Sequence, residues 1–332
     1  MILVTGGTGF LGAYLLHYLI REGRAVRATF RPYSDFSLLG DIREQIEWVP
    51  CNLLDVNALD DAMTGVEQVY HAAAKVSFRK KDAERMIRIN EQSTANVVNL
   101  ALEKGVKKLL HVSSIAALGR RSAHEEIDES VHWEWNNQNT AYAISKFKAE
   151  QEVWRGIAEG LDAVIINPSL ILGAGRWNAG TPSMFRSVAK GLPAVPAGVN
   201  GMVDVRDVAR MAIGLMDSDI QAERFILNSE NLSYRKLFGL IAAATGAKVP
   251  SFEMQAWHGR IVARAEELLA FFQRRQPRLD MDYVKSFGKN FYYSNEKIRK
   301  ALDVDFIPIA QTVKDTARVY LERKRPALLP LF

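Results

Sequence analysis

A tyrosine and a lysine lie four residues apart in the segment TAYAISKFKAE, residues 140–150. On a helix, residues at this spacing share a face and come within contact distance, so the ammonium group of Lys146 can act on the phenol of Tyr142. A phenol has an ordinary pKa of about 10, and a fixed positive charge beside it stabilises the phenolate form. The spacing therefore predicts that Tyr142 is a general acid or base whose pKa is moved towards neutrality. Because this spacing also arises by chance on amphipathic helices, a second feature has to support it.

Two adjacent serines provide that second feature, in the segment HVSSIAALG. The apolar run before them predicts a strand that ends at the carboxyl edge of a parallel sheet, which is the edge where open α/β folds bind ligands. A hydroxyl of Ser113 or Ser114 could there hold a substrate oxygen beside Tyr142. Neither serine has a base near it in the sequence, and no G-x-S-x-G motif surrounds them, which disfavours hydrolase chemistry.

A glycine-rich segment, TGGTGFLG, follows the first apolar run and satisfies two spacings, one through Gly6, Gly9 and Gly12 and one through Gly7, Gly9 and Gly12. Glycine permits a tight turn with positive φ and lets the backbone approach a pyrophosphate without Cβ atoms in the way. It also brings the N–H groups of a helix N-terminus to the phosphate. Because the motif lies between a predicted strand and a predicted helix, it predicts dinucleotide binding.

The end of the second predicted strand, in VRATFRPYSD, bears on the choice of dinucleotide. Folds that bind NAD often have Asp or Glu there for the ribose 2′-hydroxyl, whereas an arginine can accommodate the 2′-phosphate of NADP. Arg31 occupies this strand end, and Asp35 follows four residues later. We therefore expect NADP as the cofactor, with NAD as the alternative. An exposed arginine without a ligand is the other interpretation of Arg31.

The elements that must position these residues follow from an alternation of short apolar runs and longer segments of helical period. The candidate strands are MILVT, AVRATF, IEWVP, QVYHAA, KLLHVSS and DAVIINPS. Three helices between them end at Gly23, Gly65 and Gly105, where a C-cap tolerates left-handed backbone. The pattern is typical of β-α-β units and predicts an α/β fold with a doubly wound parallel sheet, the Rossmann type.

The alternation fails after about Gly173, where GAGRWNAGTPS reads as a loop that leaves the sheet. We therefore predict a dinucleotide-binding domain over residues 1–172, to which the chain could return within 203–229. A smaller, mostly helical substrate-binding region is expected over residues 173–332. It includes a helix capped by Ser233 and an amphipathic run over residues 255–275.

Composition limits the classes of protein that the chain can belong to. Its 332 residues, 48% of them hydrophobic, are enough for a large buried core, and no uninterrupted apolar stretch is long enough to span a membrane. The single cysteine, Cys51, cannot form an internal disulfide, and the apolar start lacks the features of a secretory signal, so we expect a cytoplasmic protein. The histidines show no metal-ligand spacing with Cys51 or with acidic residues, so no metal is expected.

The net charge of +5 lies wholly in residues 251–332, which hold 15 Lys or Arg against 10 Asp or Glu. These basic residues alternate with acidic ones, which predicts a solvated face and disfavours a nucleic-acid partner. We expect a small-molecule substrate, and a homodimer formed through the predicted helices around residues 84–104 and 140–158.

The motifs TGGTGFLG, HAAA, HVSSIAALG, YAISK and NPSLILGAG resemble, in their order and spacing, those of the extended short-chain dehydrogenase/reductase family. The resemblance covers nearly the whole chain. It implies that Tyr142 is the catalytic acid or base and that Lys146 is both its partner and a ribose ligand. It also implies that Ser114 is the donor to the substrate oxygen, since the active hydroxyl of such proteins lies five residues before the glycine matched by Gly119.

The same resemblance, with the glycine motif, implies a set of cofactor-binding residues. These are Gly6, Gly9, Phe10, Leu11, Gly12, Arg31, Asn52, Leu53, Ala72, Ala73, Ala74, Asn90, Tyr142, Lys146, Pro168 and Ser169. Two positions depart from the family pattern. Asn52 stands where relatives usually have Asp beside the adenine, and INEQST keeps only Asn90 and Thr94 of the motif Asn-Val-x-Gly-Thr.

Three functions are compatible with these motifs: an oxidoreductase acting on a carbonyl or hydroxyl group, a nucleotide-sugar epimerase or dehydratase, and a non-catalytic dinucleotide-binding regulator. The complete set of Ser114, Tyr142 and Lys146 argues against the regulator. Dehydratases of this kind have a motif similar to Thr-Asp-Glu at the positions of Ser114, Ile115 and Ala116 in this chain. The apolar side chains of Ile115 and Ala116 cannot transfer protons.

The segment AVIINPSLILGAG is more similar to dihydroflavonol reductases and 3β-hydroxysteroid dehydrogenases than to epimerases. We therefore expect a reductase that acts on a carbonyl compound with an apolar ring or chain. The alternative is an epimerase in which Arg176 or Arg186 holds the pyrophosphate of a nucleotide sugar.

Overall fold

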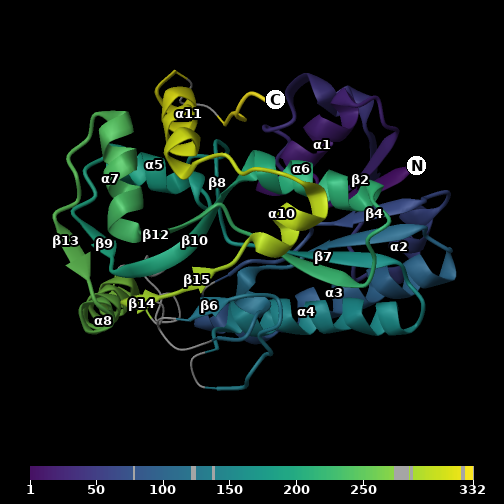
Figure 1. Ribbon diagram of the computed structural model, residues 1–332, viewed down its shortest axis with the longest axis horizontal. Coiled ribbons are helices and arrows are strands. Elements are labelled where there is room, and N and C mark those ends of the chain that lie inside the picture. Colours follow the sequence, from purple (N-terminus) through teal and green to yellow (C-terminus); the bar gives the residue numbers. More distant parts are fainter. Residues whose placement is uncertain are drawn as a thin grey trace.

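The computed structural model describes residues 1–77, 79–120, 125–136, 139–272, 284, 287–322 and 326–331; for residue 265 and residues 267–272 it describes the backbone only. A parallel sheet forms the centre of the molecule, with helices against both faces and a second region at one end (Figure 1). Residues 273–275, the last part of the predicted amphipathic run, lie outside this description.

The central sheet has seven parallel strands in the order β11-β7-β5-β4-β1-β2-β3. They span β1 Ile2–Thr5, β2 Val26–Phe30, β3 Glu47–Pro50, β4 Gln68–His71, β5 Lys108–Val112, β7 Ala163–Pro168 and β11 Glu223–Leu227. The first six in chain order are the six strands expected from the sequence, and β11 adds a seventh at the edge beside β7. The strand order reverses between β1 and β4, and ligands of open α/β sheets bind at such a reversal. The predicted doubly wound sheet is confirmed.

Helices cover both faces of this sheet (Figure 1). On one face, α1 (Phe10–Arg21) packs on α6 (Val205–Asp217), and on the other, α3 (Ala83–Glu103) packs along α4 (Ala141–Ala158), with α2 (Val56–Met63) beside α3. The chain enters α4 through an N-cap at Thr140, whose hydroxyl accepts a hydrogen bond from the backbone N–H of Ala143 at 3.1 Å. This cap fixes the helix start two residues before Tyr142.

The C-terminal region combines helices with short strands. Its helices are α5 Pro182–Ala189, α7 Tyr234–Thr245, α8 Ala256–Phe272, α10 Glu296–Leu302 and α11 Ile309–Glu322, and Ser233 caps α7 as predicted. Its strands are β8 Leu170–Leu172, β9 Ala194–Pro196, β10 Gly198–Asp204, β12 Glu230–Ser233, β13 Phe252–Met254, β14 Lys289–Asn290 and β15 Tyr292–Tyr293, with β15 paired to β6 Glu126–Ile127. β10 pairs with β8, β12 and β14 in a second sheet. We had expected this region to be mostly helical, so the second sheet was not predicted. These strands are too short to leave a clear alternation in the sequence.

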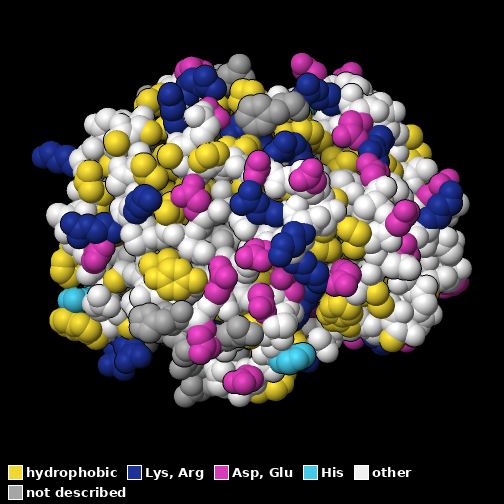
Figure 2. Space-filling view, viewed as in Figure 1, with side chains coloured by type: hydrophobic (Ala, Val, Ile, Leu, Met, Phe, Trp, Pro, Cys, Tyr) yellow, Lys and Arg dark blue, Asp and Glu magenta, His cyan; other side chains and the backbone are white. Residues whose placement is uncertain are grey.

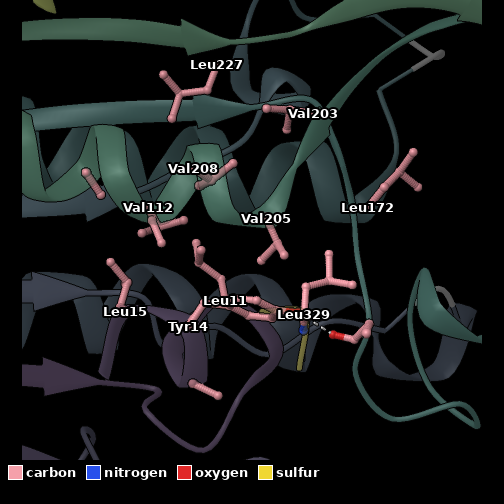
Figure 3. Packing of buried hydrophobic residues seen from close by; sticks show 14 of the residues in the cluster. Leu11, Tyr14, Leu15, Val112, Leu172, Val203, Val205, Val208, Leu227 and Leu329 are labelled. Carbon is pink, nitrogen blue, oxygen red and sulfur yellow. Dashed lines mark hydrogen bonds between the residues drawn. The ribbon is translucent and has the colours of Figure 1, made fainter. Parts of the chain in front are cut away.

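The main hydrophobic core lies between α1 and α6 (Figure 3). Leu11, Tyr14 and Leu15 of α1 pack there with Val205 and Val208 of α6. The hydroxyl of Tyr14 donates to the carbonyl of Ala174 at 2.9 Å and accepts from the N–H of Leu329 at 2.8 Å. One buried phenol therefore joins α1, the loop after β8 and the C-terminal segment.

Basic and acidic side chains are interspersed over the face of the molecule seen in Figure 2. Two bases of α10 pair with acidic residues: Lys297 with Glu223 and Lys300 with Glu296. Arg299 pairs with Asp305 beyond the helix. Within the described residues, no helix is both long and apolar enough to cross a membrane.

Candidate active site

The glycine-rich segment forms a tight turn between β1 and α1. Gly6 has φ of +75°, and a Cβ atom built on it would lie 2.7 Å from the backbone nitrogen of Ala73 on the neighbouring strand end. Gly9 is the N-cap of α1 and donates to the carbonyl of Gly6 at 2.9 Å. A Cβ on Gly12 would lie 2.2 Å from that same carbonyl oxygen. Only glycine fits this approach, and the free N–H groups of the first turn of α1 suit a pyrophosphate.

A cleft of about 200 Å³ opens beside this turn, at the carboxyl ends of β1, β2, β3 and β4. Eight of the predicted cofactor-binding residues line it: Gly6, Gly9, Arg31, Asn52, Leu53, Ala72, Ala73 and Ala74. The sequence reasoning missed other residues of its lining, namely Thr8, Thr29, Phe30, Ser34, Cys51, Leu54, Lys75, Ile89 and Ser93. All but Ile89 and Ser93 of α3 lie at the end of a strand or within four residues after one, so the rule that ligands bind at carboxyl ends of strands could have found them.

Two predicted cofactor-binding residues of α1 direct their side chains away from this cleft. Leu11 is buried in the main core, and Phe10 packs on Tyr14 and lies against the backbone of Gly175. Only their backbone N–H groups, in the first turn of the helix, remain suited to a phosphate.

Arg31 is exposed at the mouth of the cleft, and Asp35 is held away from it by Arg176. The guanidinium of Arg176 donates to the carboxylate of Asp35 at 2.6 Å, to its backbone carbonyl, and to the carbonyl of Thr8 at 2.9 Å. The N–H of Ser37 also donates to that carboxylate at 2.8 Å. These hydrogen bonds, those from Ser37 foremost, lower the pKa of Asp35. The arginine that could have held a sugar pyrophosphate therefore joins the glycine-rich turn to the loop after β2.

The predicted catalytic hydroxyls meet at the end of β5. Ser114 caps the short helix η3 (Ile115–Ala117), where its hydroxyl accepts from the N–H of Ala116 at 3.1 Å, and it is also hydrogen-bonded to Tyr142. Burial raises the pKa of Tyr142, and the hydrogen bond with Ser114 opposes this. The expectation that this pKa is moved towards neutrality is wrong, because desolvation of the phenolate by burial is the larger effect and raises it.

Lys146 lies one turn along α4 and is 5% exposed. Its ammonium donates to the carbonyl of Val112, at the end of β5, at 2.9 Å. Burial lowers the pKa of Lys146 to about 8, and the negative charge of Glu150 opposes that decrease. At neutral pH most molecules therefore carry the positive charge at this position.

Asn90 of α3 supports the site and does not line the cleft. Its amide oxygen accepts from the N–H of Lys75 at 2.7 Å, while its amide nitrogen donates to the carbonyl of Lys75 at 2.9 Å and to the hydroxyl of Ser145 at 3.1 Å. Asn90 thus ties the segment after β4 to α4. It connects the cofactor cleft to the helix of Tyr142 and Lys146.

Pro168 and Ser169 follow β7, the strand beside β5. Pro168 pairs with Leu227 of β11, and the N–H of Ser169 donates to the carbonyl of Leu227 at 3.0 Å. In the described part of the chain, the buried hydroxyl of Ser169 has no hydrogen-bond partner. A buried polar atom without a partner is suited to a ligand that would supply one.

Sequence reasoning gave no role to two buried polar residues near Ser114, namely Glu150 and Asn167. Ser113, the alternative to Ser114, and Asn167 each donate to the carboxylate of Glu150, and Asn167 also donates to the carbonyl of Ser114 at 3.0 Å. The spacing of four residues between Lys146 and Glu150 was a signal that could have found the carboxylate.

A second hollow, of about 370 Å³, lies on the other side of α4 and contains none of the predicted site residues. It is lined by Glu129, His132, Trp133, Phe147, Gln151, Trp154, Glu223, Arg224 and Lys297. The candidate active site is instead at the carboxyl ends of the central strands, where the glycine-rich turn follows β1 and where Ser114, hydrogen-bonded to Tyr142, follows β5. Among the residues that the structure describes, no group of three or more His, Cys, Asp or Glu side chains could hold a metal ion.

A doubly wound sheet with a glycine-rich turn at its strand reversal defines a dinucleotide-dependent protein, and the chain is an NAD(P)-dependent oxidoreductase of the extended short-chain type. It belongs to the NAD dependent epimerase/dehydratase family, whose model matches residues 2–226.

Similar proteins include reductases. The chain is 33% identical to the "Putative dihydroflavonol 4-reductase" of Synechocystis sp., over 94% of this chain and 92% of that protein. It is 27% identical to cinnamoyl-CoA reductase 1 of Petunia hybrida, over 97% of this chain and 92% of that protein.

Among solved structures, that of gox2253 has a TM-score of 0.82 at 32% identity, covering 97% of this chain and 98% of that one. The UDP-glucose 4-epimerase of Thermotoga maritima, solved with UDP-glucose, has a TM-score of 0.79 at 19% identity, with 97% and 98% covered. The second likeness is one of fold alone.

Proposed function

We propose that this protein is an NADPH-dependent reductase of a carbonyl compound that carries an apolar ring or chain. The observation that carries the proposal is the hydrogen-bonded pair Ser114 and Tyr142, placed at the carboxyl edge of the sheet with buried Lys146 one turn along the helix. Two hydroxyls can there bind the same carbonyl oxygen, and one of them can give it a proton.

The proton in this reaction comes from Tyr142. Since burial raises its pKa, the phenol stays protonated at neutral pH and is ready to act as an acid. The cofactor, when bound, supplies the hydride. Ser114 holds the substrate oxygen in place, and the positive charge of Lys146 stabilises the phenolate that Tyr142 becomes.

Reduction is favoured over epimerisation by two observations on this chain. Arg176, which could have bound a sugar pyrophosphate, already contacts the carboxylate of Asp35 and the carbonyl of Thr8. The similar proteins described above are named as reductases of a dihydroflavonol and of cinnamoyl-CoA, both of which carry aromatic rings. An apolar substrate also suits Val76, which is exposed and directly follows the cleft-lining residues 72–75.

NADPH is favoured over NADH by the charges at the mouth of the cleft. Arg31 is exposed there, on a strand end that approaches the ribose of a bound dinucleotide in this fold. The carboxylate of Asp35 already accepts from Arg176 and from the N–H of Ser37, which makes it a poorer acceptor for a ribose 2′-hydroxyl.

We further propose that residues 1–172, with part of 203–229, bind the cofactor, and that most of residues 173–332 bind the substrate. A homodimer through α3 and α4 is supported by their position side by side on one face of the sheet. Light scattering on the purified protein tests the dimer. We expect twice the mass of one chain, and the mass of a single chain would contradict the proposal. A cytoplasmic location stays a prediction from the lone cysteine.

The experiment that tests the function is a screen of aromatic and aliphatic carbonyl compounds against the protein with excess NADPH. We expect loss of NADPH absorbance matched mole for mole by alcohol formation. Interconversion of UDP- or GDP-sugars with no net consumption of NADPH would establish the epimerase instead.

A further inference from the structure

Glu150 lies on α4, one turn beyond Lys146, and is 1% exposed. One oxygen of its carboxylate accepts from the hydroxyl of Ser113 at 2.6 Å and from the amide of Asn167 at 2.8 Å. The other accepts from the guanidinium of Arg224, on β11, at 3.1 Å and from the indole of Trp154 at 3.3 Å. All four partners are donors, which is the arrangement that an ionised carboxylate requires.

These contacts connect three neighbouring strands, β5 and β7 at their carboxyl ends and β11 near its start. Ser113 directly follows β5, Asn167 belongs to β7 and Arg224 to β11. The amide nitrogen of Asn167 that donates to Glu150 also donates to the carbonyl of Ser114 at 3.0 Å. The backbone of Ser114 is therefore held through Asn167, and the hydroxyl of the adjacent Ser113 is engaged by Glu150.

Charges near Lys146 come from few groups. Tyr142 and Glu150 share its helix, and His71 of β4 and His111 of β5 are close enough for the lysine charge to lower their pKa values. Burial, the larger effect, keeps both histidines uncharged at neutral pH. From α3, the neutral amide of Asn90 donates to the hydroxyl of Ser145, the residue before Lys146. From β11, Arg224 reaches Glu150 itself. Among the described residues, Glu150 is the carboxylate that opposes the effect of burial on the pKa of Lys146.

We propose that Glu150 is a positioning residue of this active site, whose carboxylate fixes the strand ends around Ser114 and whose negative charge keeps the buried Lys146 charged. Arg224 is its counter-ion, because a buried carboxylate needs a partner to remain ionised. The inference rests on the proposed function for its consequence in catalysis, but the geometry that carries it is independent of the substrate.

The test compares Glu150→Gln with the parent in the pH dependence of kcat/KM for carbonyl reduction. Removal of a nearby negative charge makes it easier for both Lys146 and Tyr142 to lose a proton. The alkaline limb of the profile should therefore move to lower pH by about one unit. The direction is the same whether the limb reports loss of the proton from Lys146 or from Tyr142. Glu150→Asp keeps the charge and should leave the limb where the parent has it, even if turnover falls.

A matched control is Glu152→Gln, which removes a carboxylate from the same helix, where Glu152 pairs with Arg155 near the surface. This variant should leave the limb unchanged. Glu150→Gln leaves Arg224 hydrogen-bonded to the carbonyls of Glu129 and Val131 but without a carboxylate partner, so that variant could fail to fold. The double variant Glu150→Gln with Arg224→Met removes both charges, and the limb should still move down, since the carboxylate is the charge that acts on the lysine.

A second measurement does not depend on activity. Protein labelled with ¹³C at lysine Cε is titrated by NMR without substrate, and the Lys146 signal is assigned with Lys146→Met. The pKa of Lys146 in the parent should be about 8 and should fall by about one unit in Glu150→Gln. An unchanged lysine titration in a folded Glu150→Gln variant would overturn the inference. If the titration moves while no carbonyl compound is reduced, the inference stands and the proposed function fails.

Discussion

Substitution of Gly12 by alanine tests whether the turn between β1 and α1 binds the cofactor. The added Cβ would lie 2.2 Å from the carbonyl oxygen of Gly6 and 2.9 Å from the Cα of Gly7. Such contacts essentially never fall below 3.0 Å, so α1 must move away from the turn by about 0.8 Å. Both partners of the clash are backbone, and no side-chain rotation can relieve it.

The expected cost follows from the hydrogen bonds that this displacement breaks. Hydrogen bonds from backbone N–H groups to a charged phosphate contribute about 1.5 to 3 kcal/mol each, and the shift misplaces about two of them in the first turn of α1. The total of about 3 to 6 kcal/mol corresponds to NADPH binding weakened at least about a hundredfold. The strain should also lower the free energy of unfolding by about 1 to 3 kcal/mol.

Gly239→Ala is the matched control, because Gly239 lies inside α7 and a Cβ there would meet nothing within 4 Å. It should leave NADPH affinity unchanged and stabilise the protein by about 0.5 to 1 kcal/mol. Affinity is measured by the fluorescence of bound NADPH, and stability by urea unfolding. If Gly12→Ala is folded and binds NADPH as tightly as the parent does, the phosphate site is not at this turn.

Three further outcomes are expected. Tyr142→Phe should lower turnover by about a hundredfold or more with NADPH affinity nearly unchanged; equal turnover in steady-state assays would remove Tyr142 as the acid. Arg31→Ala should weaken NADPH but not NADH by about tenfold or more, through loss of a charge-assisted contact; a parent that prefers NADH contradicts this. Because burial lowers the pKa of His71 to about 3, only the unfolded chain binds a proton there between about pH 6.5 and pH 4, and the lowered pKa of His111 has the same effect at that residue below about pH 6.5. The free energy of unfolding should therefore fall as the pH is lowered, by about 1.4 kcal/mol per unit for each histidine. His111→Leu should halve the histidine contribution to the change in unfolding free energy with pH, as measured by urea unfolding at several pH values. An unchanged pH dependence would show that His111 is not buried and neutral.

The sequence predicted the central fold because each strand is a short apolar run and each helix end carries a local signal. Left-handed glycines end or follow three helices as expected, at Gly23, Gly65 and Gly105. The second sheet and the pairing of β15 with β6 were not predicted, since β14 and β15 have two residues each and depend on pairing with distant segments. Pairing between segments far apart in the chain leaves no periodicity to read.

The candidate site was predicted in its residue types but not in its electrostatics. Spacing placed Tyr142 and Lys146 together and put Ser113 or Ser114 near them, because a helix face and a strand end are local features; the family resemblance then favoured Ser114. The sign of the pKa change at Tyr142 depends on how deeply the phenol is buried, which a sequence does not state. For the same reason the ion pair of Asp35 with Arg176, formed by two loops far apart in the chain, had no signal in the sequence.

The central claim is that this protein transfers a hydride from NADPH to a carbonyl carbon, with the proton supplied at Tyr142. The most direct measurement uses NADPH deuterated at C4 of the nicotinamide, with product analysis by mass spectrometry and NMR. We predict one deuterium on the carbinol carbon of the alcohol and an equal amount of NADP⁺, with both products lost together in Tyr142→Phe. Deuterium absent from the alcohol, or a nucleotide sugar epimerised while the NADPH keeps its label, would contradict the account.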